Sequence, residues 1–394
     1  MSKPNFDKLI DRRNTNSYKW DEYSDVLPMW VADMDFETAP CITEALRRRV
    51  EHGIFGYTIV PDSYYEAIIN WFQRRHHWTI QQDWIQYTTG VVPALSCVIK
   101  ALTMPGEKVI VMTPVYNCFF SSIRNNGCEV LTCPLLPTQE EPFFSDPSLP
   151  TTYSYEIDFE AFEDCCEDEK ATLFVLCNPH NPAGRVWRTD ELEKIATICR
   201  RNHVRVVSDE IHCEIVMPCH HYVPYATIDD TAIVLCSPSK SFNTAGLQIA
   251  NIICRDAETR RRIDRAININ EVCDVNPFGV IALEAAYNEG EEWLTALNEY
   301  IYCNYRAFVD YFNEWFPQLP VTTLEGTYLV WVDISATEMT GDELTDCLKD
   351  HAELLLSSGS IYGDDRYVRF NIACPRSRMM EGLRRFRSVV KSLL

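Results

Sequence analysis

The sequence predicts an α/β protein, with a large domain built on a mostly parallel, doubly wound sheet and a smaller α+β domain. Between about residues 84 and 240, short apolar runs typical of buried strands alternate with segments of helical periodicity. This alternation predicts a parallel sheet with helices on both faces. From about residue 277 the pattern changes to long helical stretches, which indicates a second unit. A chain of 394 residues is long enough for two domains.

The elements follow from the positions of these runs. Turn residues separate them, including Thr-Gly at 89–90, Thr-Pro at 113–114 and Ser-Pro at 237–238. Residues 137–155 are rich in Pro, Ser and Thr and predict a surface loop. In the first 276 residues the expected strands are 84–87, 108–112, 130–133, 172–177, 205–208 and 232–236, and the expected helices are 40–50, 62–75, 94–102, a segment ending near 125, 159–167 and 189–202.

Three regions are expected along the chain. Residues 1–45 read as an irregular N-terminal arm that joins the small domain, residues 46–276 as the large ligand-binding domain and residues 277–394 as the small domain. In the small domain we expect helices at 277–288, 291–315, 341–351 and 377–391, and strands at 328–333 and 367–372.

Charge and composition exclude several function classes. A formal net charge of -21 argues against binding to nucleic acid or to an anionic membrane. No stretch approaches the ~18 uncharged apolar residues of a membrane span. The 17 cysteines are scattered, with no Cys-x-x-Cys pair and no secretory signal. Reduced thiols in a cytoplasmic protein are therefore expected.

The most informative stretch is Ser-Pro-Ser-Lys-Ser-Phe-Asn at 237–243. It follows the apolar run 232–236, so Lys240 is expected at the carboxyl end of a buried strand. Ligands of α/β sheets bind at that edge. Lys240 is therefore a candidate Schiff-base amine, and the alternative is a solvated loop lysine.

Other strand ends carry matching groups. The N–H groups of Gly90, Val91 and Val92 open a helix and can hold an anion, although an ordinary tight turn has the same sequence. Tyr116 can stack on an aromatic ligand or pack at the rim. Asp209 ends a Val-rich strand, where it can pair with a cationic ring nitrogen or cap the next helix.

Asn178 and Asn181 each precede a proline in a rigid turn, Asn-Pro-His-Asn-Pro-Ala-Gly at 178–184. Their amides can bind a ligand oxygen or only shape the loop, and the turn is a candidate for cis peptide bonds. One ligand, pyridoxal 5'-phosphate (PLP), satisfies the whole set: phosphate at the Gly90 turn, ring on Tyr116, phenolate at Asn181, ring nitrogen at Asp209 and aldehyde at Lys240.

The order and spacing of these motifs resemble the fold-type I PLP enzymes, the aspartate aminotransferase superfamily, over nearly the whole chain. The sequence is most similar to the MalY/PatB group of cystathionine β-lyases and C–S lyases. That likeness rests on Met-Trp-Val-Ala-Asp-Met-Asp-Phe at 29–36, Phe-Gly-Tyr-Thr at 55–58 and Ser-Asp-Glu-Ile-His at 208–212.

The resemblance implies further roles. Tyr57 reaches the cofactor phosphate of a partner subunit, which implies a homodimer, and Ser237 also binds phosphate. Arg369 clamps the substrate α-carboxylate, a task suited to a bidentate guanidinium. His212 takes the position of a tyrosine that contacts the cofactor phenolate in many aminotransferases. Gln248 replaces a phosphate-binding arginine found in many of them, so phosphate affinity rests on the other groups.

The activity implied by the resemblance is PLP-dependent β-elimination from L-cystathionine or related L-cysteine S-conjugates, giving thiol, pyruvate and ammonia. Lys240 would remove the Cα proton, and Asp209 would keep the ring nitrogen protonated. The main alternative is a class I/II aminotransferase, which shares the first proton abstraction. Some members of the lyase group also regulate by binding a protein partner, which is a third possibility.

Overall fold

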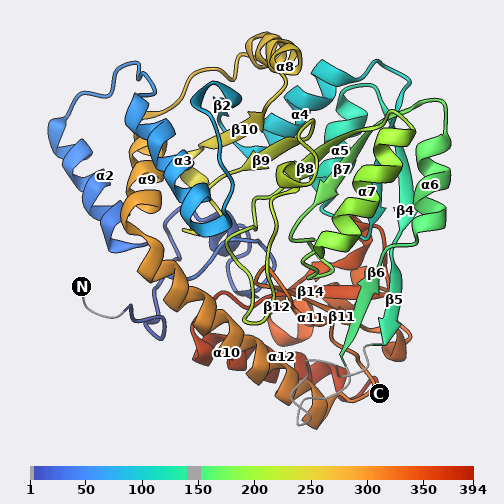
Figure 1. The fold of residues 1–394 in the computed structure, drawn as a ribbon. Helices are drawn as coiled ribbons and strands as arrows, with labels where there is room; N and C mark the ends of the chain where they lie inside the picture. The colour runs from blue at the N-terminus through green and yellow to red at the C-terminus, as the bar shows by residue number, and fades with distance from the viewer. Residues whose placement is uncertain (1–3, 140–151) are drawn as a thin grey trace.

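The computed structural model describes residues 4–139 and 152–394, and its centre is a sheet of seven strands (Figure 1). The strand order is β2-β10-β9-β8-β7-β3-β4. Strand β10 pairs antiparallel with β2 and β9, and the other four strand pairs of this sheet are parallel, so the predicted mostly parallel α/β sheet is confirmed. In this order the strands are Ile85–Thr88, Ala250–Cys254, Ile233–Cys236, Arg205–Asp209, Ala171–Cys177, Lys108–Thr113 and Glu129–Pro134.

Helices cover both faces of this sheet because successive side chains of a strand point to opposite sides. In β3, Val109 and Val111 pack in one apolar cluster, whereas Ile110 and Met112 pack in another. The first cluster includes side chains of α4 (Val91–Leu102), α5 (Asn117–Asn125) and α8 (Ala257–Ile269), and the second those of α6 (Phe159–Glu167) and α7 (Thr189–Arg201). The strands are thus apolar throughout because both faces are buried.

Two expectations about local structure need correction. The predicted loop 137–155 carries strands at both ends, β5 (Leu136–Gln139) and β6 (Tyr153–Glu156), which pair as an antiparallel hairpin; residues 140–151 lie outside the described residues. Tyr155 is buried, and its hydroxyl accepts a hydrogen bond from the Trp331 indole. Alternating tyrosines thus favour a strand despite the flanking prolines.

The helix predicted at 94–102, α4, starts earlier, at Val91, because Pro93 is tolerated in the first turn of a helix.

A three-stranded antiparallel sheet forms the centre of the C-terminal part, in the order β11-β14-β13 (Leu329–Asp333, Tyr367–Asn371, Ser357–Ser358). Phe370 of β14 packs between Phe308 and Phe386, with ring centroids 5.1 and 5.3 Å away. These two residues belong to α10 (Glu291–Trp315) and α12 (Arg376–Val390), so the sheet and the helices share one core. The exact boundaries predicted for the domains stay a prediction.

The N-terminal arm runs along this C-terminal part. Its short strand β1 (Leu27–Pro28) pairs in parallel with β12 (Leu354–Leu355), and the chain then crosses towards Lys240. None of the described helices combines the length and apolar composition that a membrane span requires. The remaining elements are α1 (Tyr18–Asp21), α2 (Pro40–His52), α3 (Asp62–His76), α9 (Pro277–Glu289), α11 (Gly341–Ala352) and short 3-10 turns at Gln82–Trp84, Tyr225–Thr227, Ala245–Leu247, Ser335–Thr337 and Gly359–Tyr362.

Candidate active site

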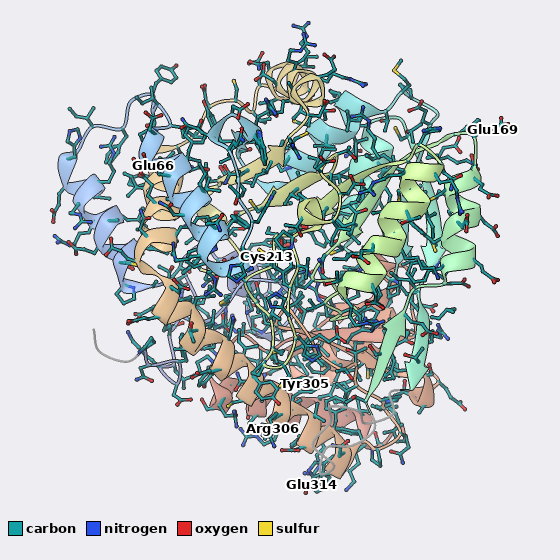
Figure 2. The ribbon with its side chains drawn as sticks, in the orientation of Figure 1. Glu66, Glu169, Cys213, Tyr305, Arg306 and Glu314 are labelled. Carbon is teal, nitrogen blue, oxygen red and sulfur yellow. The ribbon has the colours of Figure 1, made fainter. Side chains whose placement is uncertain are left out.

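The predicted ligand groups meet where the carboxyl ends of the parallel strands face the C-terminal part. Asp209 is the last residue of β8, and Lys240 lies in the turn that follows β9. The charges of Asp209 and Arg369 both shift the pKa of Lys240, so β8, β14 and the turn after β9 contribute to one site. Cys213, labelled near the centre of Figure 2, directly follows His212 and marks this region.

Lys240 is held by the N-terminal arm. Its Nζ atom donates a hydrogen bond to the carbonyl oxygen of Ala32 at 2.7 Å, and the Tyr328 hydroxyl donates to the same oxygen at 2.9 Å. Burial and the positive charge of Arg369 lower the pKa of Lys240 to about 8, against the opposing effects of Asp33 and Asp209. A lysine with a lowered pKa presents more neutral amine near pH 7 than an exposed one.

Asp209 is buried, and burial raises the pKa of its carboxyl to about 6. The backbone N–H of Ile211 donates to Oδ1 at 3.1 Å, and this bond and the nearby Lys240 both favour the ionised form. A buried carboxylate with one such bond is costly unless a cationic partner joins it. A protonated ring nitrogen would be such a partner.

His212 is buried, and its Nδ1 atom has no hydrogen-bond partner among the described residues. Burial, together with the charges of Lys240 and Arg369, lowers its pKa well below the usual value, so the imidazole is neutral. Its ring meets the Tyr328 ring edge-on, with centroids 5.9 Å apart. An unsatisfied buried nitrogen beside Lys240 fits a site that completes its hydrogen bonds with a ligand.

Arg369 is buried in β14, and its guanidinium links two predicted site segments. Its Nη1 donates to Oδ1 of Asn181 at 3.0 Å, and its Nη2 donates to the carbonyl of Trp30 at 2.8 Å. Its Nε atom has no partner within the described chain. Because Arg369 occupies the Asn181 oxygen, the amide N–H group of Asn181 is the donor left for a ligand.

Asn178 has a structural role. Its Oδ1 accepts from the backbone N–H of Trp187 at 3.3 Å, and its Nδ2 donates to Val223 at 3.4 Å. The peptide bonds before Pro179 and Pro182 are cis, as the sequence suggested. Of the two alternatives left open for this asparagine, shaping the loop is the one the contacts favour.

The protein groups that are predicted to bind phosphate have different surroundings. Gly90 is the N-cap of α4, so the N–H groups of Val91 and Val92 lie in a first turn without intrahelical partners. The Ser237 hydroxyl already donates to Ile249 at 2.6 Å and accepts from the Ser239 N–H at 3.1 Å. A donor role for Ser237 towards phosphate thus requires it to leave Ile249, and this role stays a prediction.

Two aromatic residues complete the predicted set. Tyr116 is the N-cap of α5; burial raises its pKa, with smaller effects from Cys118, Asp209 and Arg369, so it lies beside the same charges. Tyr57 is fully exposed, at 101%, in the segment between α2 and α3. One copy of the chain therefore leaves Tyr57 open to solvent, and its contact with the cofactor of a partner subunit stays a prediction.

The sequence analysis did not reveal the residues that fix the arm at the site. Asn371 donates from Nδ2 to the carbonyls of Val31 and Asp33, both at 2.6 Å. Asn243 accepts from the Met34 N–H and donates to the Met34 carbonyl, each at 3.0 Å. A signal was present, because Asn371 follows Arg369 at the two-residue spacing that shares one face of a strand.

Comparison with known proteins agrees with this geometry. The family model described as aminotransferase class I and II matches residues 24–386. The chain belongs to this family. Among its relatives, cystathionine beta-lyase PatB of Bacillus subtilis is 37% identical to this chain over 398 residues. The match covers 98% of this chain and 100% of PatB. The predicted family resemblance is therefore confirmed.

Solved structures of family members have the same fold. Cystalysin from Treponema denticola, which contains a pyridoxal 5'-phosphate cofactor, is similar with a TM-score of 0.92 and 32% identity, covering 99% of this chain and 100% of cystalysin. A PLP-bound putative aminotransferase from Clostridium difficile 630 has a TM-score of 0.92 and 40% identity, covering 98% and 100%. The lysine of lowered pKa, the buried carboxyl and the unpaired His212 nitrogen fit that cofactor.

Proposed function

We propose that the protein is a PLP-dependent C–S β-lyase, which cleaves L-cystathionine or a related L-cysteine S-conjugate to thiol, pyruvate and ammonia. The observation that carries the proposal is the full-length similarity to cystathionine beta-lyase PatB. The meeting of Lys240, Asp209 and Arg369 at one edge of the sheet supports it. Each of these groups has a task in removing the Cα proton of an amino acid, the step that precedes breakage of the Cβ–S bond.

PLP, when bound, supplies an electron sink for the charge that develops at the substrate α-carbon. Arg369 binds the substrate α-carboxylate, using its unpartnered Nε and the N–H groups that now contact Trp30 and Asn181. This fixes the Cα–H bond relative to Lys240. Orienting the reacting bond in this way lowers the entropic part of the barrier.

Lys240 takes the Cα proton on its Nζ atom. A pKa of about 8 makes this amine a competent base near neutral pH, and the proton it accepts can be donated to the leaving group. The Ala32 carbonyl holds Nζ in place between these steps through the 2.7 Å hydrogen bond. Asp209 would stabilise a proton on the ring nitrogen, and Asn181 and His212 would contact the phenolate oxygen.

The proposal includes phosphate binding by the α4 N-terminus, Ser237 and the partner subunit's Tyr57, and hence a homodimer. The full exposure of Tyr57, together with Ile54, Phe55 and Ile59 at 67%, 54% and 83%, supports a second subunit on this segment. Apolar patches of this kind commonly mark interfaces. We also propose a cytoplasmic location, which the absence of disulfides among all 17 cysteines supports.

An assay without keto acid tests the proposal. The purified protein is mixed with L-cystathionine, and its absorbance spectrum, pyruvate and free thiol are followed together. Equal amounts of pyruvate and thiol, with a cofactor absorbance band, are the expected result. A protein that shows no band after addition of PLP would contradict both the cofactor and the activity.

The family description and the putative aminotransferase from Clostridium difficile favour one alternative, transamination. It predicts conversion of the cofactor to its pyridoxamine form with no pyruvate from cystathionine. The same assay therefore separates the two activities, since only elimination releases a thiol in the absence of a keto acid.

A further inference from the structure

Arg369 is a buried cation whose hydrogen-bond partners are all uncharged. Only 3% of the residue is exposed. Its guanidinium donates to the side-chain oxygen of Asn181 at 3.0 Å, and one N–H group is shared between the Trp30 carbonyl at 2.8 Å and the Ser357 hydroxyl at 3.4 Å. Among the described residues, no acidic side chain forms an ion pair with it. A buried charge without an anion is costly, so other groups must stabilise it.

The ring of Tyr362 is one of these groups. Tyr362 is the last residue of the 3-10 turn Gly359–Tyr362, which follows β13, and only 2% of it is exposed. The Cζ atom of Arg369 lies over this ring, 4.7 Å from its centroid. The negative face of an aromatic ring attracts a guanidinium, and the attraction is strongest where water is excluded. The ring therefore stabilises the arginine without supplying an anion.

The position of the Tyr362 ring is fixed from two sides. Its centroid lies 5.6 Å from that of Trp331, with the two ring planes at 86°. Trp331 of β11 is the residue directly opposite Arg369 in the pairing with β14, so the two side chains share one face of that sheet. On the other side, the Val115 N–H donates to the Tyr362 carbonyl at 3.0 Å, and Val115 directly precedes Tyr116. The turn is thus tied both to the strand of Arg369 and to the segment of the predicted ring-stacking tyrosine.

We propose that Tyr362 is a positioning residue of the lyase reaction, which holds the Arg369 guanidinium ready for the α-carboxylate of the amino-acid substrate. An acidic residue in its place would also stabilise the buried arginine, but it would compete with the substrate for the N–H groups. A ring face stabilises the charge and leaves those groups to oxygen acceptors that the substrate can replace. The inference rests on the proposed function, because it takes Arg369 as the group that binds the carboxylate.

Binding of two unreactive ligands to the PLP-loaded enzyme tests this role. L-Alanine has the α-carboxylate but no leaving group, and L-alaninamide carries a neutral amide in place of the carboxylate. Absorbance titration gives a dissociation constant for each ligand. Tyr362→Leu removes the ring face and should raise the constant for L-alanine roughly 5- to 30-fold. The constant for L-alaninamide should change much less, because this ligand has no negative charge for Arg369 to bind.

Tyr367→Leu is the matched control. Tyr367 is also 2% exposed, and its ring stacks on Trp331 with centroids 5.0 Å apart. Its cationic neighbour is Arg366, whose Cζ atom lies 5.7 Å from the ring centroid, and not Arg369. The control therefore reproduces a loss of aromatic packing around Trp331, and it should bind L-alanine like the parent.

A second pair of variants keeps the test independent of any packing defect in Tyr362→Leu. Tyr362→Phe keeps the ring face and should bind L-alanine like the parent. Pentafluorophenylalanine at position 362 has a similar shape but a ring face of opposite charge, so it should bind L-alanine more weakly than Tyr362→Phe.

The proposal is overturned if the phenylalanine and pentafluorophenylalanine variants bind L-alanine equally. It is also overturned if Tyr362→Leu weakens the binding of L-alanine and L-alaninamide by the same factor, which a purely structural role predicts. Arg369→Lys separates this inference from the proposed function. If Arg369→Lys binds L-alanine like the parent, the carboxylate-binding role of Arg369 fails and the inference fails with it. If that variant binds L-alanine more weakly while the Tyr362 variants do not, only the role of Tyr362 is refuted.

Discussion

The Nζ atom of Lys240 donates a hydrogen bond to the carbonyl oxygen of Ala32 at 2.7 Å, although 208 residues separate the two in the chain. The carbonyls on either side, of Val31 and Asp33, both accept from Asn371 at 2.6 Å. The N-terminal arm is therefore clamped between the lysine turn and β14. It belongs to the site, because it fixes the position of the proposed base.

Replacing Lys240 by alanine should reduce turnover by at least about 10²–10⁴-fold, the usual contribution of a positioned proton-transfer group. The loss should appear in kcat, since Arg369 still binds the carboxylate. Steady-state pyruvate release measures it, with circular dichroism as a control for folding. A Lys240→Ala variant with the turnover of the parent enzyme would rule out the proposed role.

Asn371→Ala should destabilise the protein. The substitution removes two hydrogen bonds to the part-buried carbonyls of Val31 and Asp33. Each carbonyl keeps one other donor, the Asp33 N–H and the Lys19 Nζ atom respectively, so the expected cost is about 0.5–1.5 kcal/mol per lost bond. Urea unfolding measures the change in the free energy of unfolding. Asn268→Ala is the matched control, because its exposed amide donates only to Asp264 within one helix. Equal effects of the two variants would contradict the clamp.

Arg369→Lys should raise KM for L-cystathionine more than it lowers kcat. The lysine ammonium keeps the positive charge but loses the bidentate contact with the substrate carboxylate. Hydrogen bonds to charged groups contribute about 1.5–3 kcal/mol. This corresponds to roughly a 10- to 100-fold loss in kcat/KM. Arg366→Lys, on an exposed arginine paired with Asp364, is the control and should match the parent. An unchanged KM in Arg369→Lys would remove Arg369 from substrate binding.

Much of this site could be predicted from the chain because its groups sit at strand ends. Asp209 and Lys240 follow apolar runs whose burial can be predicted from the sequence. A parallel sheet brings the carboxyl ends of its strands to one edge. Arg369 was inferred from a family resemblance, and its bond to Asn181 at 3.0 Å depends on tertiary packing across 188 residues.

What escaped prediction has no local pattern. The Ala32 carbonyl is a backbone group, and its role depends only on where the arm crosses the site. Strand β10 has only five residues, Ala250–Cys254, and no local signal encodes its antiparallel direction. Ser237 was predicted to bind phosphate, but its hydroxyl already donates to Ile249. Side-chain partners of this kind become visible only when the packed structure is known.

Lys240 should also make the stability of the cofactor-free chain depend on pH. Its pKa falls from 10.5 in the unfolded chain to about 8 in the folded one. Between these values the unfolded chain binds one more proton, so this group makes the free energy of unfolding rise with pH. Below about pH 8 both states are protonated, and its contribution is constant and least favourable.

Lys240→Met removes this contribution. Urea unfolding of the parent and the variant at several values between pH 7 and 10 measures it, because titrations common to both cancel in the difference. The parent should gain stability relative to the variant as the pH rises above 8. A difference that stays flat, or that falls with pH, would show that the folded chain does not lower the lysine pKa.

Tyr57→Phe should weaken cofactor binding without destabilising the fold. The ring is 101% exposed in one copy of the chain, so only the hydroxyl's contact with a partner's phosphate can be lost. A hydrogen bond to a charged group contributes about 1.5–3 kcal/mol, so the dissociation constant for PLP should rise roughly 10- to 100-fold. Absorbance titration measures it, and sedimentation shows whether the dimer persists. Tyr18→Phe is the control, since Tyr18 is also exposed, at 64%, but packs on Trp30 of its own chain. If Tyr57→Phe binds PLP like the parent while the dimer is intact, the hydroxyl has no part in the site; if the parent is an active monomer, Tyr57 cannot reach a second subunit at all.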